Sequence, residues 1–298
     1  MKIIAVDIGG TAVKSGLVDG ESLRGLRETP TPTEKGGRAV MALVQEVIAS
    51  YGPESADGIG VSTAGLVDSK TGAIVFAEDC IRNYTGTQVK NLLEEAFSLP
   101  TAVENDLNAA ALGEGVSGAG KGVDSFLCVG FGTGIGGAAV LGGKLYSGAH
   151  FGAGEFGHMV THAGGLPCPC GQKGCFERYA STSALVRRAQ ELDPALDSGR
   201  AIFSRLEEPA VKALVDGWIQ EIVYGLASLV HLWDPSRVIL CGGVMQQPYL
   251  IERLGALVPE NVMPAYRSVE IRAAKLGNRA GLLGAGELAR RLVLGQPG

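Results

Sequence analysis

Residues 2–18 read KIIAVDIGGTAVKSGLV, and this stretch decides the fold that we expect. Two β-rich runs, Lys2 to Asp7 and Val13 to Val18, flank the glycine turn Gly9-Gly10-Thr11, so the segment predicts a β-hairpin. Residues 126–141, FLCVGFGTGIGGAAVL, repeat the same order of strand, glycine turn and strand, with the turn placed at residues 130–137. Two such units in one chain indicate two related halves.

Helices and further strands alternate along the rest of the chain. Apolar residues at helical spacing predict helices over residues 39–48, 89–97, 106–115, 210–233 and 280–294. Apolar β-rich runs predict strands over residues 58–62, 101–104 and 237–241. Strands that alternate with helices favour an α/β fold, in which helices cover both faces of each sheet.

Composition limits the kind of protein that this sequence encodes. The 298 residues are enough for about two domains, and 46% of them are apolar. The net charge of −5 gives no reason to expect binding to nucleic acid or to an acidic membrane surface. Only four apolar residues separate Lys2 from Asp7, which is too few for a signal-peptide core, so we expect a cytoplasmic protein. The 45 glycines predict many turns or close approaches to ligands.

The first glycine turn, within Asp7-Ile8-Gly9-Gly10-Thr11, is a candidate phosphate-binding site. Its backbone N–H groups and the Thr11 hydroxyl can donate to phosphate oxygens, and Asp7 can hold Mg²⁺ directly or through water. An ordinary hairpin turn has the same composition, so this pentapeptide alone does not distinguish the two interpretations.

The second turn, Gly132-Thr133-Gly134-Ile135-Gly136-Gly137, contains the dinucleotide-binding pattern G-x-G-x-x-G. That pattern should open a helix, whereas residues 138–141 predict a strand, so we reject a site for NAD. We interpret Gly132, Thr133 and Gly134 as a second phosphate turn. Gly242-Gly243, after the strand at 237–241, is a candidate third loop that packs against a nucleotide base; alone, it would be only a turn into a helix.

The segment Glu104-Asn105-Asp106 is the candidate catalytic segment. Asp106 follows a predicted strand and stands near the start of a predicted helix, where the helix dipole favours an anion, so it is placed to act as a base. Asn105 offers a donor and an acceptor to a hydroxylated ligand. The common alternative for such an aspartate is a helix cap.

One histidine and three cysteines within 18 residues match the ligand set of a closed tetrahedral zinc site: His158, Cys168, Cys170 and Cys175. The spacing is not that of a nucleic-acid zinc finger. The alternative is a loop with three unbound thiols, and a disulfide is not expected in a reducing compartment. Cys128 and Cys241 lie in apolar strands and are predicted core residues, and Cys80 is uninformative.

Glu155 and Glu177 flank the cysteine cluster in a glycine-rich region. Two carboxylates beside a histidine can accept paired hydrogen bonds from adjacent hydroxyls of a polyol, although most glutamates are simply solvated. Two phosphate turns, an aspartate between them and a metal-braced polar loop together predict a phosphotransferase that acts on a hydroxyl group.

These motifs resemble those of the ROK family of bacterial sugar kinases over nearly the whole chain. The matching segments are Asp7-Ile8-Gly9-Gly10-Thr11 with Lys14, Glu104-Asn105-Asp106 with Asn108-Ala109-Ala110, Gly132 to Gly137, Gly154 to His158, Cys168 to Glu177, and Gly242-Gly243. The stretch Cys168-Pro169-Cys170-Gly171-Gln172-Lys173-Gly174-Cys175 is the most specific of them.

The resemblance implies a duplicated actin-like ATPase (ribonuclease H-like) fold of two domains with the active site in the cleft between them. It implies a small domain of residues 1–110 completed by 282–298, and a large domain of residues 111–281 with the zinc loop. A homodimer is also expected from it.

The resemblance also implies an enzyme that uses ATP and Mg²⁺ to phosphorylate an aldohexose at its primary hydroxyl, as glucokinases do. Asp106 would be the general base, and a structural zinc would fix His158 through one ring nitrogen. The sugar contacts would be Gly65, Asn83, Asn105, Asp106, Glu155, His158 and Glu177. The nucleotide contacts would be Asp7, Gly9, Gly10, Thr11, Lys14, Gly132, Thr133, Gly134, Gly242 and Gly243.

Two segments depart from the family pattern and leave the sugar undecided. Many members have Pro-Gly where this chain has Ala64-Gly65, and Cys80 to Gly86 differs from the corresponding stretch of typical glucokinases. N-acetylmannosamine, fructose or a β-glucoside therefore remain alternative substrates. The family also includes sugar-sensing repressors, but these need a DNA-binding segment before the first strand, and this strand begins at Lys2.

Overall fold

We describe the protein from a computed structural model, which covers residues 1–77 and 81–296. The chain forms two compact units. Unit 1 contains Met1–Asp124, Ala139–Ala153 and Lys275–Gly298, and unit 2 contains Ser125–Ala138 and Gly154–Ala274. The chain therefore passes between the units at four places in the sequence, and each unit is described by itself.

The main sheet of unit 1 has five strands in the order β3-β2-β1-β4-β7. The first two form the predicted hairpin, and β1 continues parallel to β4, which is parallel to β7. A separate two-stranded sheet pairs β5 with β6. The strands are β1 (Lys2–Ile8), β2 (Ala12–Asp19), β3 (Ser22–Pro30), β4 (Gly58–Thr63), β5 (Leu66–Asp68), β6 (Ala73–Phe76) and β7 (Thr101–Asn105).

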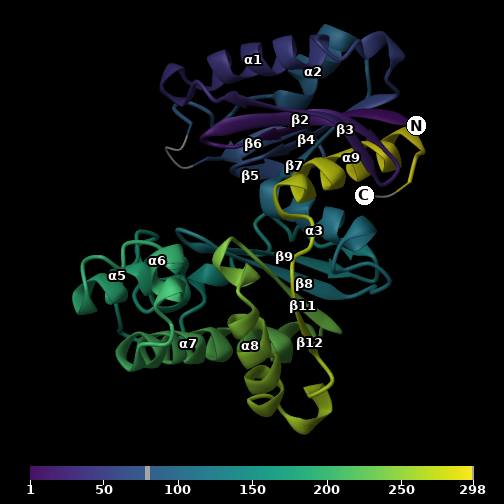
Figure 1. Ribbon diagram of the computed structural model, residues 1–298. Helices are drawn as coiled ribbons and strands as arrows, with labels where there is room; N and C mark the ends of the chain where they lie inside the picture. Colours follow the sequence, from purple (N-terminus) through teal and green to yellow (C-terminus); the bar gives the residue numbers. More distant parts are fainter. Residues whose placement is uncertain (78–80, 297–298) are drawn as a thin grey trace. The chain divides into compact units, whose positions relative to one another are not determined.

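Helices cover both faces of this sheet (Figure 1). Helices α1 (Gly37–Ala49) and α2 (Val89–Phe97) lie on one face and bury apolar residues such as Val40 and Leu93. Helix α9 (Ala280–Val293) lies on the other face and packs against α3 (Asp106–Ser117). The predicted α/β arrangement is therefore confirmed for this unit.

The end of α3 is fixed by a buried carboxylate. Glu114 is fully buried, and its side-chain oxygens accept hydrogen bonds from the backbone N–H groups of Ala119, Lys275 and Leu276, at 2.6 to 3.1 Å. These bonds stabilise the buried charge and tie α3 to the segment before α9. These bonds fix the C-terminal part of the helix whose first residue is Asp106.

The second main sheet has the order β10-β9-β8-β11-β12. Its strands are β8 (Phe126–Phe131), β9 (Ile135–Leu141), β10 (Lys144–Leu145), β11 (Arg237–Cys241) and β12 (Glu270–Ala273). In both sheets, three strands that are consecutive in the sequence lie side by side, in reverse order. The first of these three strands is followed across the sheet by two later strands that are parallel to each other. This shared order confirms the internal repeat that the two glycine hairpins predicted.

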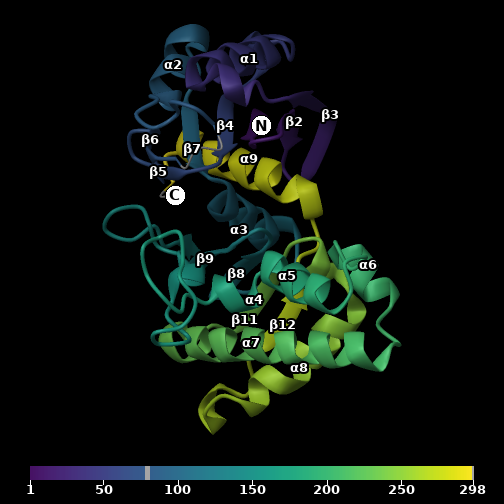
Figure 2. The same ribbon diagram turned by 90° about the vertical axis from the view of Figure 1, so that its left-hand side faces the viewer.

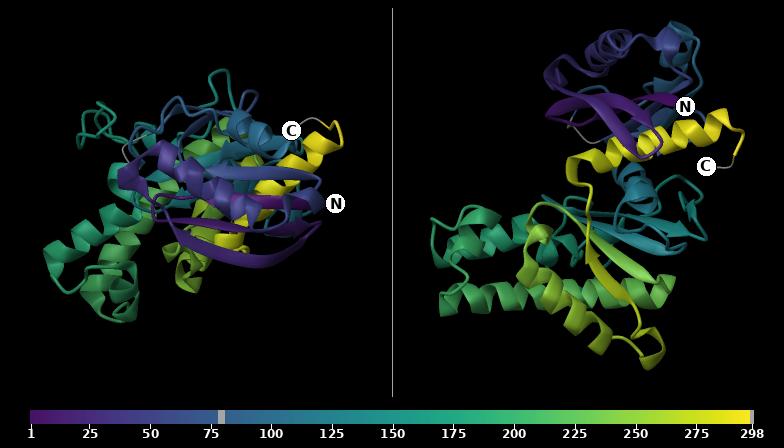
Figure 3. Two further views of the ribbon diagram at one scale, coloured as in Figure 1. Left: turned by 90° about the horizontal axis from the view of Figure 1, so that it is seen from above. Right: turned by 45° about the vertical axis from the view of Figure 1, so that its right-hand side comes forward.

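Unit 2 is built around the long helix α7 (Pro209–Trp233), which Figure 2 shows in side view and Figure 3 from two further directions. Trp218 on this helix is fully buried and donates through Nε1 to the Ala180 carbonyl at 3.0 Å. The other helices of unit 2 are α4 (Glu177–Ala180), α5 (Thr182–Leu192), α6 (Gly199–Ser204) and α8 (Pro248–Glu260).

By length and composition, α7 is the one helix of the described residues that is apolar enough to cross a membrane. Half of its most apolar window is buried inside the structure. Asp234 follows it in the left-handed conformation, and Pro235 comes next, so the helix ends where the sequence predicted. The burial is that of a core helix in a globular unit.

The structure differs from the sequence predictions at several points. The sequence does not predict strand β3, because most of its side chains are exposed and none is fully buried, so it has no apolar pattern. The extent of the second glycine turn was wrong: β8 continues to Phe131 and β9 begins at Ile135. Cys128 is buried as expected, whereas Cys241 is only half-buried, and Cys80 lies outside the described residues.

The two compact units also divide the chain differently from the predicted domains of 1–110 with 282–298 and 111–281. Unit 1 takes the whole of α3, because α3 packs along α9, and it also takes the hairpin end at residues 139–153. Residues 297 and 298 of the predicted C-terminal segment lie outside the described residues. The predicted domain boundaries remain a prediction.

Candidate active site

In unit 1, Asp7 lies at the carboxyl end of β1, at the same register as Ser62 on β4 and Lys14 on β2. The Ser62 hydroxyl donates to Asp7 Oδ1 at 2.6 Å. Burial raises the pKa of Asp7, and the Ser62 hydrogen bond and the Lys14 charge oppose that rise. The carboxylate is therefore held in a fixed position, with one oxygen left for a cation or water.

The first glycine turn is tied to the neighbouring strand. Thr31 donates from its hydroxyl to the Gly9 carbonyl at 2.7 Å, and its N–H donates to the Thr11 carbonyl at 3.0 Å. Gly10 and Thr11 are exposed at the tip of the turn. An anchored turn with an exposed tip fits the predicted phosphate contact.

The segment from Glu104 to Asp106 forms a tightly bonded corner between β7 and α3. Asn105 caps α3, since its Oδ1 accepts from the N–H groups of Leu107 and Asn108 at 3.0 and 3.2 Å. The buried Glu104 accepts from the Asn105 N–H at 2.8 Å and from Asn108 Nδ2 at 3.0 Å. The cap is thus Asn105, and Asp106 is available for another role.

Asp106 is accessible to solvent, but many protein atoms lie around its carboxylate and reduce its hydration. This loss of hydration, together with the negative charge of Asp7, raises the pKa of Asp106 to about 6. The Leu107 N–H, which donates to Asp106 Oδ1 at 2.8 Å, opposes the rise. A carboxylate with a pKa near 6 is ionised at neutral pH and is basic enough to accept a proton from a hydroxyl.

Gly65 joins this corner, whereas Asn83 does not. The Gly65 carbonyl accepts from Asn105 Nδ2 at 2.9 Å, so these two predicted sugar contacts are adjacent. Asn83 is exposed and lines a separate pocket of about 550 Å³ with residues of α1 and α2, including Arg38, Gln45 and Leu92. The next residue, Tyr84, is buried, and its hydroxyl lies 2.9 Å from the Thr63 hydroxyl.

In unit 2, three predicted nucleotide contacts meet in one pocket. Gly132, Thr133 and Gly243 line an open pocket of about 550 Å³. Its remaining walls come from Phe131, Val244 and Asp197 and from the α5 residues Thr182, Ser183, Val186, Arg187 and Gln190. The strand β9 follows the Gly132 turn, so the structure supports the rejection of a dinucleotide fingerprint. Gly242 precedes Gly243 at the end of β11 and does not line the pocket itself.

Glu177 connects the second phosphate turn to the cysteine cluster. A Cβ at Gly134 would lie 2.6 Å from Glu177 Oε2, so this carboxylate lies against the backbone of the turn. The other carboxylate oxygen, Oε1, lies 3.2 Å from Cys168 Sγ. The predicted sugar contact Glu177 is therefore a direct neighbour of two other predicted site features.

The two ring nitrogens of His158 face different partners. Nδ1 lies 3.8 Å from Cys168 Sγ, while Nε2 lies 3.8 Å from Glu155 Oε2. Glu155 is exposed and directly precedes the short 3₁₀ helix Phe156–His158. One nitrogen is thus directed to the cysteines and the other to Glu155, a predicted sugar contact.

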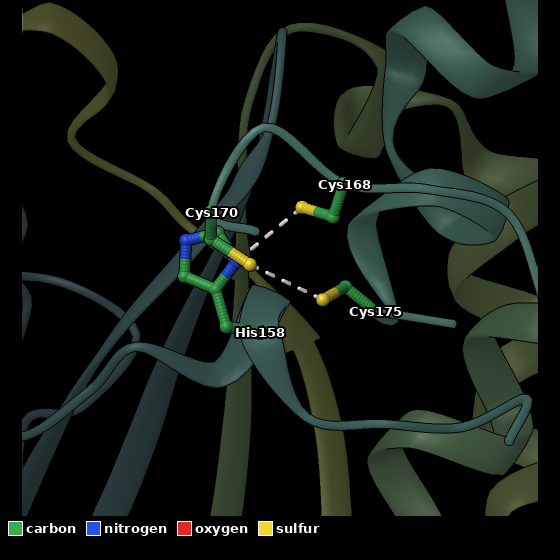
Figure 4. Close-up of side chains that lie close together, drawn as sticks. All are labelled: His158, Cys168, Cys170 and Cys175. Atoms are coloured by element: carbon green, nitrogen blue, oxygen red, sulfur yellow. Dashed lines mark hydrogen bonds between the residues drawn. The ribbon is translucent and has the colours of Figure 1, made fainter. Parts of the chain in front are cut away.

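The four predicted zinc ligands converge (Figure 4). Their ligand atoms all lie within 4.8 Å of one another, and Cys170 Sγ and Cys175 Sγ are 3.6 Å apart. Two sulfurs of a tetrahedral zinc site, each about 2.3 Å from the metal, are about 3.8 Å apart. Burial raises the pKa of the Cys168 thiol to about 12 in the absence of a cation, so thiolates here need a positive charge beside them. The residues fit zinc.

The sequence analysis missed several residues that surround these groups. Ser62 holds Asp7 in place, and Thr182, Ser183 and Arg187 line the pocket of unit 2. Ser62 could have been found, because it ends a predicted strand next to the strand of Asp7. The α5 residues have no local signal and are brought to the pocket only by tertiary packing.

Comparisons with known proteins agree with this geometry. Residues 3–292 match the sequence model of the ROK family. The chain is 35% identical to a beta-glucoside kinase from Listeria innocua, with 96% of both chains covered. It is similar in structure to a ROK hexokinase from Thermus thermophilus, with a TM-score of 0.87, 35% identity and coverage of 99% of this chain and 100% of the other.

A further similar structure is a ROK family glucokinase from Streptomyces griseus in complex with glucose and AMPPNP. Its TM-score is 0.76 and its identity 33%, with 98% of this chain and 100% of that chain covered. The family match spans nearly the whole sequence, and the similar structures share the two-domain actin-like ATPase fold. The chain belongs to the ROK family.

Proposed function

We propose that this ATP-dependent sugar kinase of the ROK family phosphorylates an aldohexose at its primary hydroxyl, as a glucokinase does. The observation that carries the proposal is the corner at Asp106. A carboxylate whose pKa is raised to about 6 stands beside Asn105, which is fixed by hydrogen bonds on three sides. This arrangement suits proton transfer from a hydroxyl that neighbouring polar groups hold in place.

In the proposed reaction, Asp106 accepts the proton of the primary hydroxyl as the sugar oxygen attacks the γ-phosphorus of ATP. The new O–P bond forms while the bond from the γ-phosphorus to the bridging β–γ oxygen breaks, and ADP leaves. Asn105 and the Gly65 carbonyl orient the sugar in unit 1. Most of the rate enhancement then comes from positioning and electrostatic stabilisation, as in other phosphoryl transfers.

Each unit has its own set of proposed binding groups. Unit 1 contributes nucleotide contacts at Asp7, Gly9, Gly10, Thr11 and Lys14. Unit 2 contributes the pocket lined by Gly132, Thr133 and Gly243, with the adjacent Gly134 and Gly242, and the sugar contacts Glu155, His158 and Glu177. Asn83 is also proposed as a sugar contact, although it is exposed and lines another pocket of unit 1.

Two metal ions belong to the proposal. Mg²⁺, held near Asp7, would neutralise charge on the phosphate groups when it is bound. Zinc, held by His158, Cys168, Cys170 and Cys175, would be structural and would fix the ring of His158. We also propose that the protein is cytoplasmic, where ATP is abundant, and that it forms a homodimer.

A substrate panel tests this function. Purified protein is incubated with Mg²⁺-ATP and glucose, mannose, fructose, N-acetylmannosamine, N-acetylglucosamine or cellobiose, and ADP release is measured. We expect the highest kcat/KM with glucose and a phosphate ester at its sixth carbon. Tight sugar binding without ADP release for any sugar would contradict the proposal and favour a sugar-sensing protein.

A further inference from the structure

The segment that carries the proposed zinc ligands also carries two proposed sugar contacts, on two arms that lie side by side. Residues 158–162 form the first arm, which begins with His158, and residues 174–179 form the second arm, which contains Glu177. Val160 of the first arm pairs with the second arm in an antiparallel β-bridge. The separation of His158 and Glu177 therefore depends on how the two arms are joined.

The backbones of the two arms are in direct contact. The Gly174 carbonyl accepts from the N–H groups of Thr161 and His162 at 3.0 and 3.1 Å. Gly174 has a φ of +84°, and a Cβ at this position would lie 1.7 Å from the His162 carbonyl oxygen. No side chain fits there, so the close approach of the arms requires glycine.

An aromatic stack between side chains joins the same two arms. The rings of His162, on the first arm, and Tyr179, on the second, are 3.9 Å apart between their centroids and inclined by 16°. Ring faces at this separation are in van der Waals contact, and aromatic pairs stabilise a fold beyond the area that they bury. Neither residue is one of the four predicted zinc ligands. The stack is therefore a connection that the chain forms with its own side chains.

The ring of His162 is held at both edges. Its Nδ1 lies 3.1 Å from the Thr161 hydroxyl, and its Nε2 lies 3.5 Å from Glu221 Oε2. Glu221 belongs to α7, the long helix around which unit 2 is built, and its side chain is only 21% exposed. The first arm is thus anchored, through His162, to the central helix of unit 2.

The ring of Tyr179 is held at its hydroxyl. The hydroxyl oxygen accepts from the Leu166 N–H at 2.7 Å, and a Cβ at Gly165 would lie 2.0 Å from it. Tyr179 lies in the short helix α4, two residues after Glu177. Rotation of this ring away from His162 would break the bond to Leu166, so the position of α4 is linked to that of the stack.

We propose that His162 and Tyr179 are positioning residues for the sugar site, because their stack fixes the arms that carry His158 and Glu177. The inference rests on the proposed function, in which His158 and Glu177 contact the sugar. The hydroxyls of a pyranose have fixed spacings, so the groups that bind them must be held at matching positions, and a displacement of about 1 Å is costly. His162 and Tyr179 do not touch the sugar in this proposal; they act through the two arms.

The structure separates this role from that of the proposed zinc. Zinc, when bound, joins the arms through His158 and Cys175, and replacement of His162 or Tyr179 leaves these ligands in the chain. It also leaves the pocket of unit 2 that is proposed to bind ATP, because neither residue lines that pocket. A loss of sugar affinity alone, with zinc content and ATP binding preserved, is therefore the signature of a positioning role.

The test measures the affinity for glucose by calorimetry without nucleotide, or for the best acceptor of the substrate panel if that is another sugar. The variants are His162→Ala, Tyr179→Ala, the double variant and Tyr179→Phe, which keeps the ring. Tyr266→Ala is the matched control, because Tyr266 packs on His231 in a second histidine–tyrosine pair of unit 2, with centroids 5.4 Å apart. Zinc content, thermal unfolding and the KM values for sugar and ATP are measured on each protein.

We expect His162→Ala and Tyr179→Ala each to weaken sugar affinity and to raise the KM for the sugar about tenfold. The double variant should lose little more than the single variants, because either one removes the whole stack. The KM for ATP should change less than about twofold, and zinc should remain at about one ion per chain. Tyr179→Phe and Tyr266→Ala should bind sugar as the wild type does.

Unchanged sugar affinity in folded Tyr179→Ala would overturn the inference, as would equal losses for sugar and ATP or an equal loss in Tyr266→Ala. Loss of zinc together with sugar affinity would also overturn it, because the stack would then act only through the metal site. If Tyr179→Ala does not fold, Tyr179→Leu, which keeps apolar bulk without a ring, decides in its place. In all these outcomes the proposed kinase function stands; it fails only if the wild type phosphorylates no sugar.

Discussion

The Ser62 hydroxyl donates a 2.6 Å hydrogen bond to Asp7 Oδ1. Ser62 is fully buried, so no water can replace the lost donor easily if the hydroxyl is removed. The bond stabilises the ionised form of a carboxylate whose pKa burial already raises. The Ser62 hydrogen bond therefore helps to fix the position of the proposed Mg²⁺-binding group and favours its ionised form.

Ser62→Ala should raise the Mg²⁺-ATP concentration needed for half-maximal rate by about tenfold, since a hydrogen bond to a charged group contributes roughly 1.5 to 3 kcal/mol. The KM for the sugar should change little. Ser15→Ala is the matched control, because Ser15 is also a buried serine in this sheet and bonds to Tyr51 instead. A similar change in both variants would indicate a general effect on the sheet.

Asp106→Asn should lower kcat by about a hundredfold to ten-thousandfold, the usual contribution of a general base. The amide keeps the shape of the side chain, so the fold and the affinity for ATP should persist. The measurement is steady-state ADP release together with circular dichroism and nucleotide binding. Turnover within a few-fold of the wild type would remove Asp106 from its proposed role.

The raised pKa of Asp106, about 6, predicts an acid limb in the pH dependence of kcat/KM for the sugar. The ionised carboxylate is the active form, so activity is full above this pKa and falls about tenfold per pH unit below it. A carboxylate with an ordinary pKa would place the limb near pH 4. Rate measurements from pH 4.5 to 8 in buffers of constant ionic strength distinguish the two.

Purified protein should contain about one zinc ion per chain, measured by inductively coupled plasma mass spectrometry. Cys175→Ser should lose the metal and unfold at a lower temperature, because Cys175 is fully buried within the cluster. Cys241→Ser is the matched control, since Cys241 is half-buried and lies outside the cluster. Full zinc content in Cys175→Ser would contradict the assignment.

The sequence predicted the elements whose burial follows a regular pattern. Strand β4 is buried throughout and β1 is buried over most of its length, and α1 alternates buried and exposed residues at helical spacing. Strand β3 has no such pattern, because it is an exposed edge strand that is held by backbone hydrogen bonds to β2. Its formation depends on a pairing partner and not on its own side chains.

The candidate site was predictable where chemistry and chain position coincide. The convergence of one histidine and three cysteines follows from ligand type and spacing, and Asp7 and Asp106 stand at strand ends where function is expected. The place of Asn83 in a separate pocket and the contribution of Arg187 to the pocket of unit 2 depend on how helices pack. Such contacts join distant parts of the sequence, so no local pattern reports them.

The nucleotide pocket of unit 2 allows a test that leaves the fold intact. Gly243 has a φ of −62°, and a Cβ at this position would meet no atom within 4 Å, so a side chain can be added without strain. Gly243→Leu would place that side chain where Gly243 lines the pocket beside Gly132 and Thr133. The KM for ATP should rise about tenfold or more, while sugar affinity and thermal stability remain near the wild-type values.

Gly255→Leu, at a position in α8 that is equally open, is the matched control and should leave the KM for ATP unchanged. An unchanged KM for ATP in Gly243→Leu would show that the nucleotide binds outside this pocket.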